Sequence, residues 1–430
     1  MNGSGRNWKR EDGWKLCGLW LFLSVVWHTS WAAPVVLLYM RDFRRGNLKQ
    51  KKTNQWRIVP AVCLFLLLVA LGISSLILPK ETMLTIENRR AAGFPAFSWE
   101  DALSGDYQEQ LQSYLNDHMA LRQNWISFKC FVDELVFGKT EEDGILLGKA
   151  SQMFTEQFVT EDGQAQYTAN LKELAAFAQN AEVPVSVMLV PSPAAILTEQ
   201  LPWDAPMESE DAMYEELEEM LQPYSQVLNV RDTLDAHREE YIYYRTDHHW
   251  TTLGAYYAYG EFCQTHGLTV AEPDFDQAVK VENFYGTHYS KTRYVLTKPD
   301  TISYFPMDNN MVIYKVTGDA EFEPETPQGI LNEEKLGQYD KYAAFLDGNN
   351  GYSVIEGNGE GKILVVKDSY ANCFVPFLLE HYEQVGVVDY RNYAYGLAHL
   401  VGKEGYEEVL FLYSIQGFAK DTRVVYINRP

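Results

Sequence analysis

Hydrophobic residues along the chain occur either in short continuous runs or at helical spacing. Runs bounded by prolines or turn residues predict buried strands, and helical spacing predicts helices that face a core. Strands are expected at residues 144–148, 183–191, 226–230, 239–244, 362–366, 384–391 and 407–414. Helices are expected at 167–180, 209–221, 252–266 and 370–382, with one or two more within 98–138 that start at a Ser98 or Ser104 cap. Because strands alternate with helices, we expect an α/β domain with a mainly parallel sheet.

Residues 275–360 interrupt this alternation. The stretch "TRYVLTKPDTISYFPMDNNMVIYKV" has short strand-like runs separated by turn residues, and it has no long helical pattern. It therefore predicts a β-rich insertion in the α/β domain.

Two uncharged stretches near the N-terminus have the length of membrane helices. Residues 58–78 contain no charge over a span that can cross a bilayer. Residues 17–40 form a second candidate, which His28 and Pro34 weaken. No small-residue cleavage site follows residue 78, so we favour an uncleaved anchor over a signal peptide.

The segment between these stretches, residues 41–57, holds seven basic residues and one acidic residue. Such a loop stays in the cytoplasm, so we expect everything after Leu78 to lie on the outer side of the cytoplasmic membrane. The predicted order is a basic region with a candidate first helix (1–57), a transmembrane anchor (58–78), a helical connector (79–140) and the α/β domain (141–430).

Charge and cysteine content exclude several classes of protein. Residues 1–57 carry eleven Lys or Arg against three Asp or Glu, a net +8, so residues 58–430 carry -31 of the total of -23. So acidic a body argues against a nucleic-acid partner, because the phosphates would be repelled. The five cysteines include no CxxC pair, so neither a disulfide scaffold nor a zinc site is expected.

One serine lies at a predicted junction of a strand and a helix. In "KILVVKDSYANCFVPFLL" an apolar strand leads directly into Asp368 and Ser369, and a helix is expected to follow. Ligands of open α/β sheets bind at this end of the strands, and N–H groups at a helix start can stabilise an oxyanion. Ser369 could be a nucleophile there, or it could only cap the helix.

The segment "TDHHW" could supply the partners that such a nucleophile needs. Asp247 and His249 are two residues apart, so on an extended backbone their side chains point the same way and could bond directly. His248 would then face the other side, toward the sheet or solvent. A divalent-metal site is the alternative for this segment, since Asp-His-His is a familiar set of ligands.

Five segments resemble one known family. They are "DGILLGK", "TDHHWTTLGAYYAY", "FYGTHYSKT", "KYAAFLDGN" and "VVKDSYANCFVPFLLEHYEQVGVVDYR". Together with the predicted anchor they resemble the bacterial DHHW protein family, and their layout is similar to the SGNH-hydrolase-like domains of alginate O-acetylation proteins. The resemblance covers most of residues 85–415 and implies an SGNH-hydrolase-like three-layer α/β/α fold.

The resemblance also implies a role for each residue of the site. Ser369 would be the nucleophile, His249 the base and Asp247 the acid that orients the base, in the chain order of the alginate proteins. Two features depart from the SGNH pattern. Lys367 replaces the glycine before Asp-Ser, and the usual oxyanion blocks are not evident, which leaves Asn372 as an oxyanion candidate.

Three other residues are candidates for substrate binding. Arg391 comes at the end of a predicted strand, where it could bind the substrate or pair with Asp368 or Asp389, and the ion pair is favoured. Tyr285 and Thr287 of "FYGTHYS" would line the cleft.

The sequence thus predicts a membrane-anchored, extracytoplasmic SGNH-like O-acyltransferase or esterase that acts on acetyl groups of a cell-surface polysaccharide. Its partners would be that polysaccharide and a membrane-bound O-acyltransferase as the acyl donor, with neither cofactor nor metal. Two alternatives stay open. The 28 tyrosines and ten tryptophans suit a cell-envelope glycan-binding or scaffolding protein with a degenerate SGNH fold. The Asp-His-His set suits a metal-dependent hydrolase.

Overall fold

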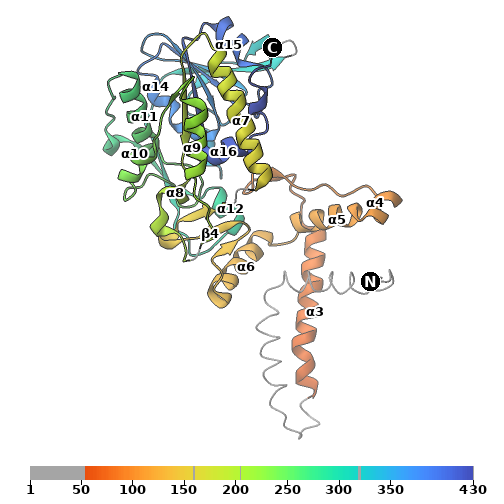
Figure 1. The fold of residues 1–430 in the computed structure, drawn as a ribbon. Helices are drawn as coiled ribbons and strands as arrows, with labels where there is room; N and C mark the ends of the chain where they lie inside the picture. Colours follow the sequence, from red (N-terminus) through yellow and green to blue (C-terminus); the bar gives the residue numbers. More distant parts are fainter. Residues whose placement is uncertain (1–53, 158–159, 204, 318–320, 430) are drawn as a thin grey trace, which may run out of the picture. The chain divides into compact units, whose positions relative to one another are not determined.

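The computed structural model describes residues 54–157, 160–203, 205–317 and 321–429. The chain forms two compact units. Of the described residues, unit 1 contains those up to Lys139 together with Thr292–Val295, and unit 2 contains those in Thr140–Lys291 and from Leu296 onward. Both units are drawn in Figure 1.

Unit 1 is mainly helical. Its elements are α3 (Asn54–Ile77), β1 (Met83–Leu84), β2 (Arg89–Arg90), α4 (Trp99–Ser104), α5 (Asp106–Asp117) and α6 (Arg122–Phe137). The Ser98 cap is confirmed, because the Ser98 side chain accepts a hydrogen bond from the Asp101 N–H. Residues 98–138 form three helices rather than one or two, since Gly105 and Leu121 take left-handed backbone angles at the two breaks.

The predicted membrane anchor falls on α3. Among the residues that the structure describes, no helix has the length and apolarity needed to cross a membrane. The anchor at residues 58–78 is therefore not confirmed, and the candidate helix at residues 17–40 lies outside the described residues.

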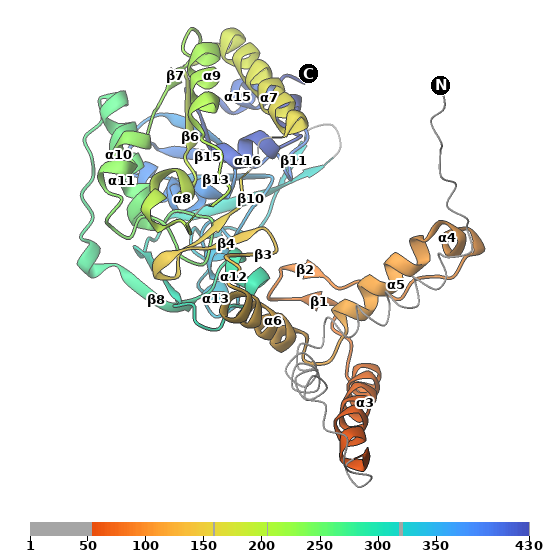
Figure 2. The ribbon, with the colours of Figure 1, turned by 60° about the horizontal axis from the view of Figure 1, so that its bottom comes forward.

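A nine-stranded sheet forms the centre of unit 2 (Figure 2). The strand order is β11-β10-β13-β15-β14-β16-β6-β7, and β12 pairs with β10. The bounds are β6 (Val185–Val190), β7 (Gln226–Val227), β10 (Asn310–Thr317), β11 (Glu321–Pro324), β12 (Gln328–Gly329), β13 (Tyr352–Glu356), β14 (Lys362–Lys367), β15 (Gln384–Val388) and β16 (Glu408–Ser414). The strands from β15 to β7 are parallel, as predicted.

The other half of the sheet is antiparallel and corrects the prediction of a mainly parallel sheet. Strands β10 to β13 come from the predicted insertion, and β13 pairs antiparallel with β15 at the edge of the parallel half. The insertion is thus β-rich, as expected, but it extends the main sheet. It also contributes β8 (Val279–Phe284) and β9 (Asp300–Tyr304), which pair with each other, and the short helices α12 (Thr287–Thr292) and α13 (Glu333–Leu336).

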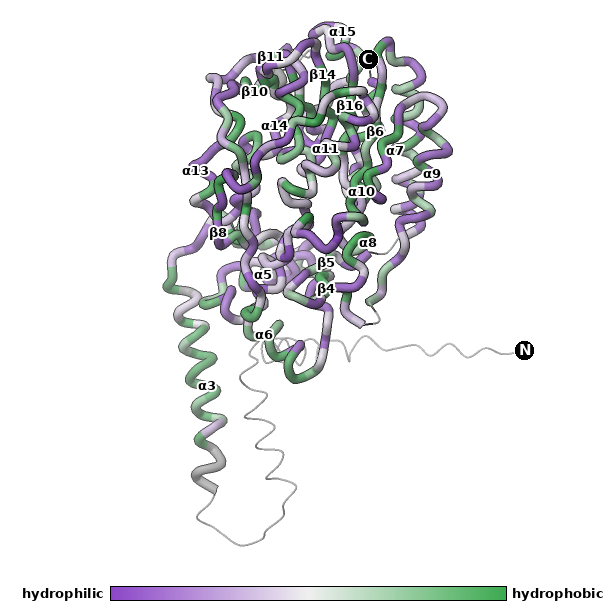
Figure 3. Tube along the Cα trace, turned by 90° about the vertical axis from the view of Figure 1, so that its left-hand side faces the viewer, coloured by the Kyte–Doolittle hydropathy of each residue, from purple (hydrophilic) through white to green (hydrophobic). Residues whose placement is uncertain are grey.

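Helices cover both faces of the sheet. On β14, Ile363 and Val365 belong to one buried cluster, and Leu364 and Val366 to the other. The first cluster includes α8 (Pro193–Ile196), α10 (Arg231–Ala236), α11 (Thr252–His266) and α14 (Val375–Leu378). The second includes α7 (Glu161–Asn180), α9 (Asp211–Leu221), α15 (Leu397–Glu404) and α16 (Ile415–Lys420). The central strands are hydrophobic in Figure 3 because both their faces are buried.

A small three-stranded sheet completes unit 2. It consists of β3 (Glu141–Glu142), β4 (Ile145–Leu147) and β5 (Met153–Thr155), all antiparallel.

Two predicted elements are wrong. Residues 239–244 form no sheet strand, because they fold back on the segment after them: Tyr244 N–H bonds to His249 C=O, and Thr251 N–H bonds to Ile242 C=O. Residues 370–382 do not form one helix. A 3-10 turn, η6 (Ser369–Cys373), is followed by α14, whose first turn contains Pro376, a residue that cannot continue a preceding helix.

Candidate active site

Ser369 begins η6, and only Asp368 separates it from the end of β14. The turn is held by the carboxylate of Asp368. One oxygen of Asp368 accepts the Tyr370 N–H at 2.9 Å, and the other accepts the N–H and the hydroxyl of Ser414, at 2.9 and 2.7 Å. Since Ser414 ends β16, these bonds fix the serine turn against the neighbouring parallel strand.

The segment Asp247–Trp250 lies in the loop before α11, whose N-cap is Thr251. Asp300 anchors this loop from β9, accepting hydrogen bonds from Thr246 N–H at 2.8 Å and from the Thr246 hydroxyl at 2.6 Å. The buried Trp250 indole donates to the Tyr370 C=O at 2.9 Å. The loop is therefore tied directly to the serine turn, although 120 residues separate them.

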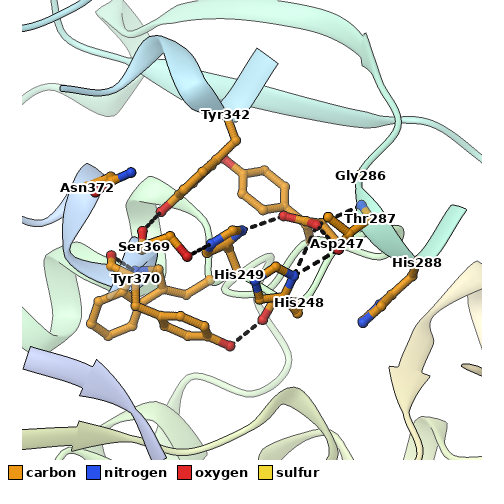
Figure 4. Close-up of polar contacts among 12 residues, drawn as sticks. Asp247, His248, His249, Gly286, Thr287, His288, Tyr342, Ser369, Tyr370 and Asn372 are labelled. Atoms are coloured by element: carbon orange, nitrogen blue, oxygen red, sulfur yellow. Dashed lines mark hydrogen bonds and ion pairs between the residues drawn. The ribbon is translucent and has the colours of Figure 1, made fainter. Parts of the chain in front are cut away.

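The three residues predicted as a triad come together in one hydrogen-bonded chain (Figure 4). His249 Nδ1 lies 2.5 Å from Asp247 Oδ2, and His249 Nε2 lies 2.8 Å from Ser369 Oγ. With Asp247 ionised, Nδ1 carries the proton and Nε2 accepts from the serine hydroxyl. This is the geometry that proton transfer from a serine to a histidine requires.

The second oxygen of Asp247 is held from the insertion. Asp247 Oδ1 accepts the Thr287 N–H at 2.8 Å and the Thr287 hydroxyl at 2.6 Å. The neighbouring Gly286 packs so closely that a Cβ there would lie 2.2 Å from the Asp247 Cβ. Thr287 thus orients Asp247 instead of lining the cleft, which corrects its predicted role.

Electrostatics favour a neutral His249 beside an ionised Asp247. Burial would raise the pKa of Asp247, but the imidazoles of His249 and His248 outweigh it and hold the pKa well below its usual range. Burial and the neighbouring His248 lower the pKa of His249 to about 4, against the opposing effect of Asp247. At neutral pH His249 is therefore able to accept a proton.

Two tyrosines that the sequence did not single out complete the surroundings. Tyr342 stacks on the His249 imidazole with ring centroids 3.9 Å apart, and its hydroxyl donates to the Ser369 C=O at 3.0 Å. The Tyr370 hydroxyl donates to the His248 C=O. Both residues lie in segments that carried the family resemblance, but nothing in their spacing indicated these contacts.

Ser369 opens into a pocket of about 510 Å³. Its lining comes from the serine turn, β5, α8, α16 and the segment after α16. His248 lines this pocket with a side chain that is 39 % exposed, and its Nδ1 lies 2.8 Å from the Thr287 hydroxyl. His248 faces the pocket rather than the sheet, and it is partly exposed to solvent there.

The other predicted site residues have different surroundings. Arg391 lines the pocket and also makes the favoured ion pair with Asp389, at 2.5 Å.

Asn372 is buried, and its amide nitrogen bonds to Gly348 C=O and Asn349 Oδ1, so its NH₂ is not aimed at Ser369 (Figure 4). Tyr285 packs on Tyr289 and is outside the set of described residues that line the pocket.

A metal ion fits this arrangement less well than a triad does. Asp247, His248 and His249 could bring one ligand atom each within 4.8 Å of one another. However, both carboxylate oxygens of Asp247 already accept short hydrogen bonds from Thr287 and His249. A metal-dependent hydrolase would need further aspartates as ligands. The chain has one Asp-x-Asp sequence, Asp274 to Asp276, but Asp274 lines a different pocket and does not add to this site.

Several solved structures are similar to this chain. A DHHW family protein from Eubacterium siraeum has a TM-score of 0.55 at 24% identity, covering 67% of this chain and 96% of its own. Bacillus cereus PatB1 has a TM-score of 0.52 at 19% identity, covering 66% and 99%. The O-acetyltransferase domain of Pseudomonas putida AlgJ has a TM-score of 0.40 at 15% identity, covering 65% and 93%.

The first two structures show that the fold of this chain is shared, and the third is too distant to support an argument. No curated protein sequence matches the chain. The family model of DHHW proteins matches residues 212–388, a segment that contains Asp247, His249 and Ser369, so the resemblance to DHHW proteins expected from the sequence is confirmed.

Proposed function

We propose that this protein is an SGNH-like O-acyltransferase or esterase that acts on acetyl groups of a cell-surface polysaccharide. The observation that carries the proposal is the continuous hydrogen-bonded chain from Asp247 through His249 to Ser369, which opens into a pocket. A serine that only capped a helix would not need a buried imidazole on its hydroxyl, nor an ionised carboxylate behind that imidazole.

The reaction would proceed through an acyl-serine. Ser369 Oγ attacks the carbonyl carbon of an acetyl ester while its proton moves to His249 Nε2. The tetrahedral intermediate collapses, and the leaving alcohol takes that proton from His249. An acceptor hydroxyl, or water in an esterase, then gives its proton to His249 and attacks the acyl-serine. The second tetrahedral intermediate collapses, and His249 returns that proton to Ser369 Oγ, which leaves a free hydroxyl and a neutral imidazole.

Two features of the site would stabilise the charges that form. Asp247 faces the imidazolium, since it is already bonded to Nδ1. The oxyanion would form beside the Ser369 backbone N–H and in the positive field of Arg391, which lines the same pocket.

Bacillus cereus PatB1 has also been solved with a sulfonyl adduct. Sulfonyl groups bond to activated nucleophiles, so this supports the same kind of chemistry in a protein of similar fold. We expect Ser369 to be the corresponding nucleophile in this chain.

The test is turnover of a chromogenic phenyl acetate by the purified full chain. Ser369→Ala, His249→Ala and Asp247→Ala should each abolish turnover. The control is Ser209→Ala, which changes an exposed serine outside the pocket lining and should leave turnover intact. Turnover that survives Ser369→Ala would contradict the mechanism. Turnover lost to a chelator and restored by manganese would favour a metal-dependent hydrolase. Retention on a polysaccharide column without turnover would favour a non-catalytic glycan-binding protein.

The proposal includes the place of the protein in the cell. The uncharged stretch at residues 58–78 and the basic segment before it support a membrane anchor with the α/β domain outside the cytoplasm. There the site would meet a cell-surface polysaccharide and receive acetyl groups from a membrane-bound O-acyltransferase.

A further inference from the structure

The pocket beside Ser369 differs in charge from the rest of the chain. The chain has 36 Lys and Arg against 59 Asp and Glu. Among the described residues that line this pocket, three are cations and two are carboxylates: Arg391, Lys420 and Arg423 against Asp368 and Asp421. Excess positive charge is therefore concentrated next to the nucleophile of a strongly acidic protein.

Arg391 is held by a buried support. Its Nε and Nη2 donate to the two oxygens of Asp389, at 2.8 and 2.5 Å, which leaves Nη1 for a ligand. Asp389 is fully buried and also lies 3.4 Å from the ammonium of Lys367. One carboxylate thus faces two basic side chains, of which Arg391 reaches the pocket. Lys367, which replaces a glycine of the SGNH pattern, is part of that support.

The other two cations come from the end of α16 and the segment after it. Lys420 is the last residue of α16 and is exposed. Arg423 is also exposed, and its Nη1 donates to the C=O of Tyr390, the residue before Arg391, at 3.4 Å. The backbone contact therefore keeps the Arg423 guanidinium close to the Arg391 segment.

The two carboxylates of the lining accept hydrogen bonds from the protein itself. Both oxygens of Asp368 accept hydrogen bonds from Tyr370 and Ser414. Asp421 Oδ1 accepts the Arg423 N–H at 2.8 Å. The carboxylates are thus engaged in fixing the loops, whereas the cationic groups of Lys420 and Arg423 remain exposed in the pocket.

We propose that the acceptor bound beside Ser369 carries an anionic group, a carboxylate or a phosphate, which Arg391, Lys420 and Arg423 bind. That this ligand is the acyl acceptor rests on the proposed function, but the binding of an anionic glycan in the pocket does not. Planar guanidinium groups suit both anions, because they donate two parallel N–H bonds to paired oxygens. Such a group would draw the chain of an anionic polymer across the pocket and bring a hydroxyl to the acyl-serine.

The test is a binding titration of the full chain, followed by calorimetry at low and at high salt. The probes are a galacturonate oligomer for carboxylate, a glycerol phosphate oligomer for phosphate and a malto-oligosaccharide as a neutral glycan. We expect at least one anionic probe to bind about tenfold or more tightly than the neutral one, with an advantage that shrinks in high salt. The preferred anionic probe identifies the anionic group.

The variant is the double charge reversal Lys420→Glu/Arg423→Glu, which should weaken binding of the anionic probe about tenfold or more. Its matched control is Lys280→Glu/Lys298→Glu, which makes the same change in net charge at exposed lysines outside the pocket and should leave the Kd nearly unchanged. Circular dichroism checks that both variants are folded, and Lys420→Gln/Arg423→Gln replaces the first variant if it is not.

Equal affinity for neutral and anionic probes would overturn the proposal, as would the absence of binding or an equal loss in the control. Because the titration needs no turnover, it can also be made on Ser369→Ala. An inactive protein that binds the anionic probe as expected would contradict the proposed function and leave this inference standing. An active protein that binds neutral and anionic probes equally well would support the proposed function and overturn this inference.

Discussion

At the scale of single residues, the state of His249 decides when the site can work. The imidazole must be neutral to accept the Ser369 proton, and burial with the neighbouring His248 lowers its pKa to about 4, while Arg391 acts in the same direction. We therefore predict that kcat/KM for a phenyl acetate stays flat through neutral pH and falls only as the pH drops toward 4. An acid limb near the ordinary histidine pKa of about 6.5 would show that His249 is far more solvated than the structure places it.

Thr287 is a positioning residue, since it contacts the acid and not the reacting atoms. Thr287→Val removes the hydroxyl bonded to Asp247 and keeps the shape of the side chain. Loss of a hydrogen bond to a charged group costs about 1.5–3 kcal/mol, so we predict a fall in kcat of about tenfold or more with little change in KM. Thr287→Ser should restore most of the rate. Equal loss in both variants, with an unchanged melting temperature, would argue against this role.

At the scale of elements, the insertion packs against the Asp247 loop so closely that there is no room for a side chain at Gly286. Gly286→Ala would place a Cβ 2.2 Å from the Asp247 Cβ, so the two segments must separate. We predict a loss of about 1–3 kcal/mol in stability, measured by denaturant unfolding, together with a loss of turnover. Gly260→Ala is the matched control, because a Cβ there, within α11, has nothing within 4 Å. A fully active and stable Gly286→Ala would contradict the contact.

The sequence predicted the elements whose signal is local. The buried strands β6, β14 and β16 and the helix α11 lie almost where their apolar patterns placed them. The run at residues 239–244 has the same pattern as a strand, but it pairs with the loop that follows it, and no local feature separates these outcomes. The antiparallel half of the sheet was missed for a similar reason, since strand pairing depends on distant partners.

The residues of the site also differ in whether a local pattern could place them. Asp247 and His249 could be paired because they are two residues apart, and Ser369 could be placed because it follows a buried strand. Thr287 and Tyr342 reach the same centre only through the folding of the insertion, so sequence spacing could not assign their contacts. Asn372 was chosen for its distance from the serine along the chain, but the 3-10 turn directs its amide toward Gly348 and Asn349.

At the scale of the whole molecule, the open prediction concerns location. If residues 58–78 anchor the chain with the α/β domain outside, the protein expressed in a bacterium should stay with membranes after carbonate washing. A protease added to spheroplasts should then digest the domain. Release by carbonate, or protection of the domain until the cells are lysed, would contradict the proposed topology.

The central claim is that Ser369 is a nucleophile activated by His249. Its most direct measurement is peptide mass spectrometry of the full chain after treatment with a sulfonyl fluoride, in which Ser369 Oγ would displace fluoride from sulfur and His249 would take the proton. The account predicts a single sulfonyl adduct on the peptide that contains Ser369, absent in Ser369→Ala and strongly reduced in His249→Ala. An unmodified Ser369, or an adduct that forms equally well without His249, would contradict it.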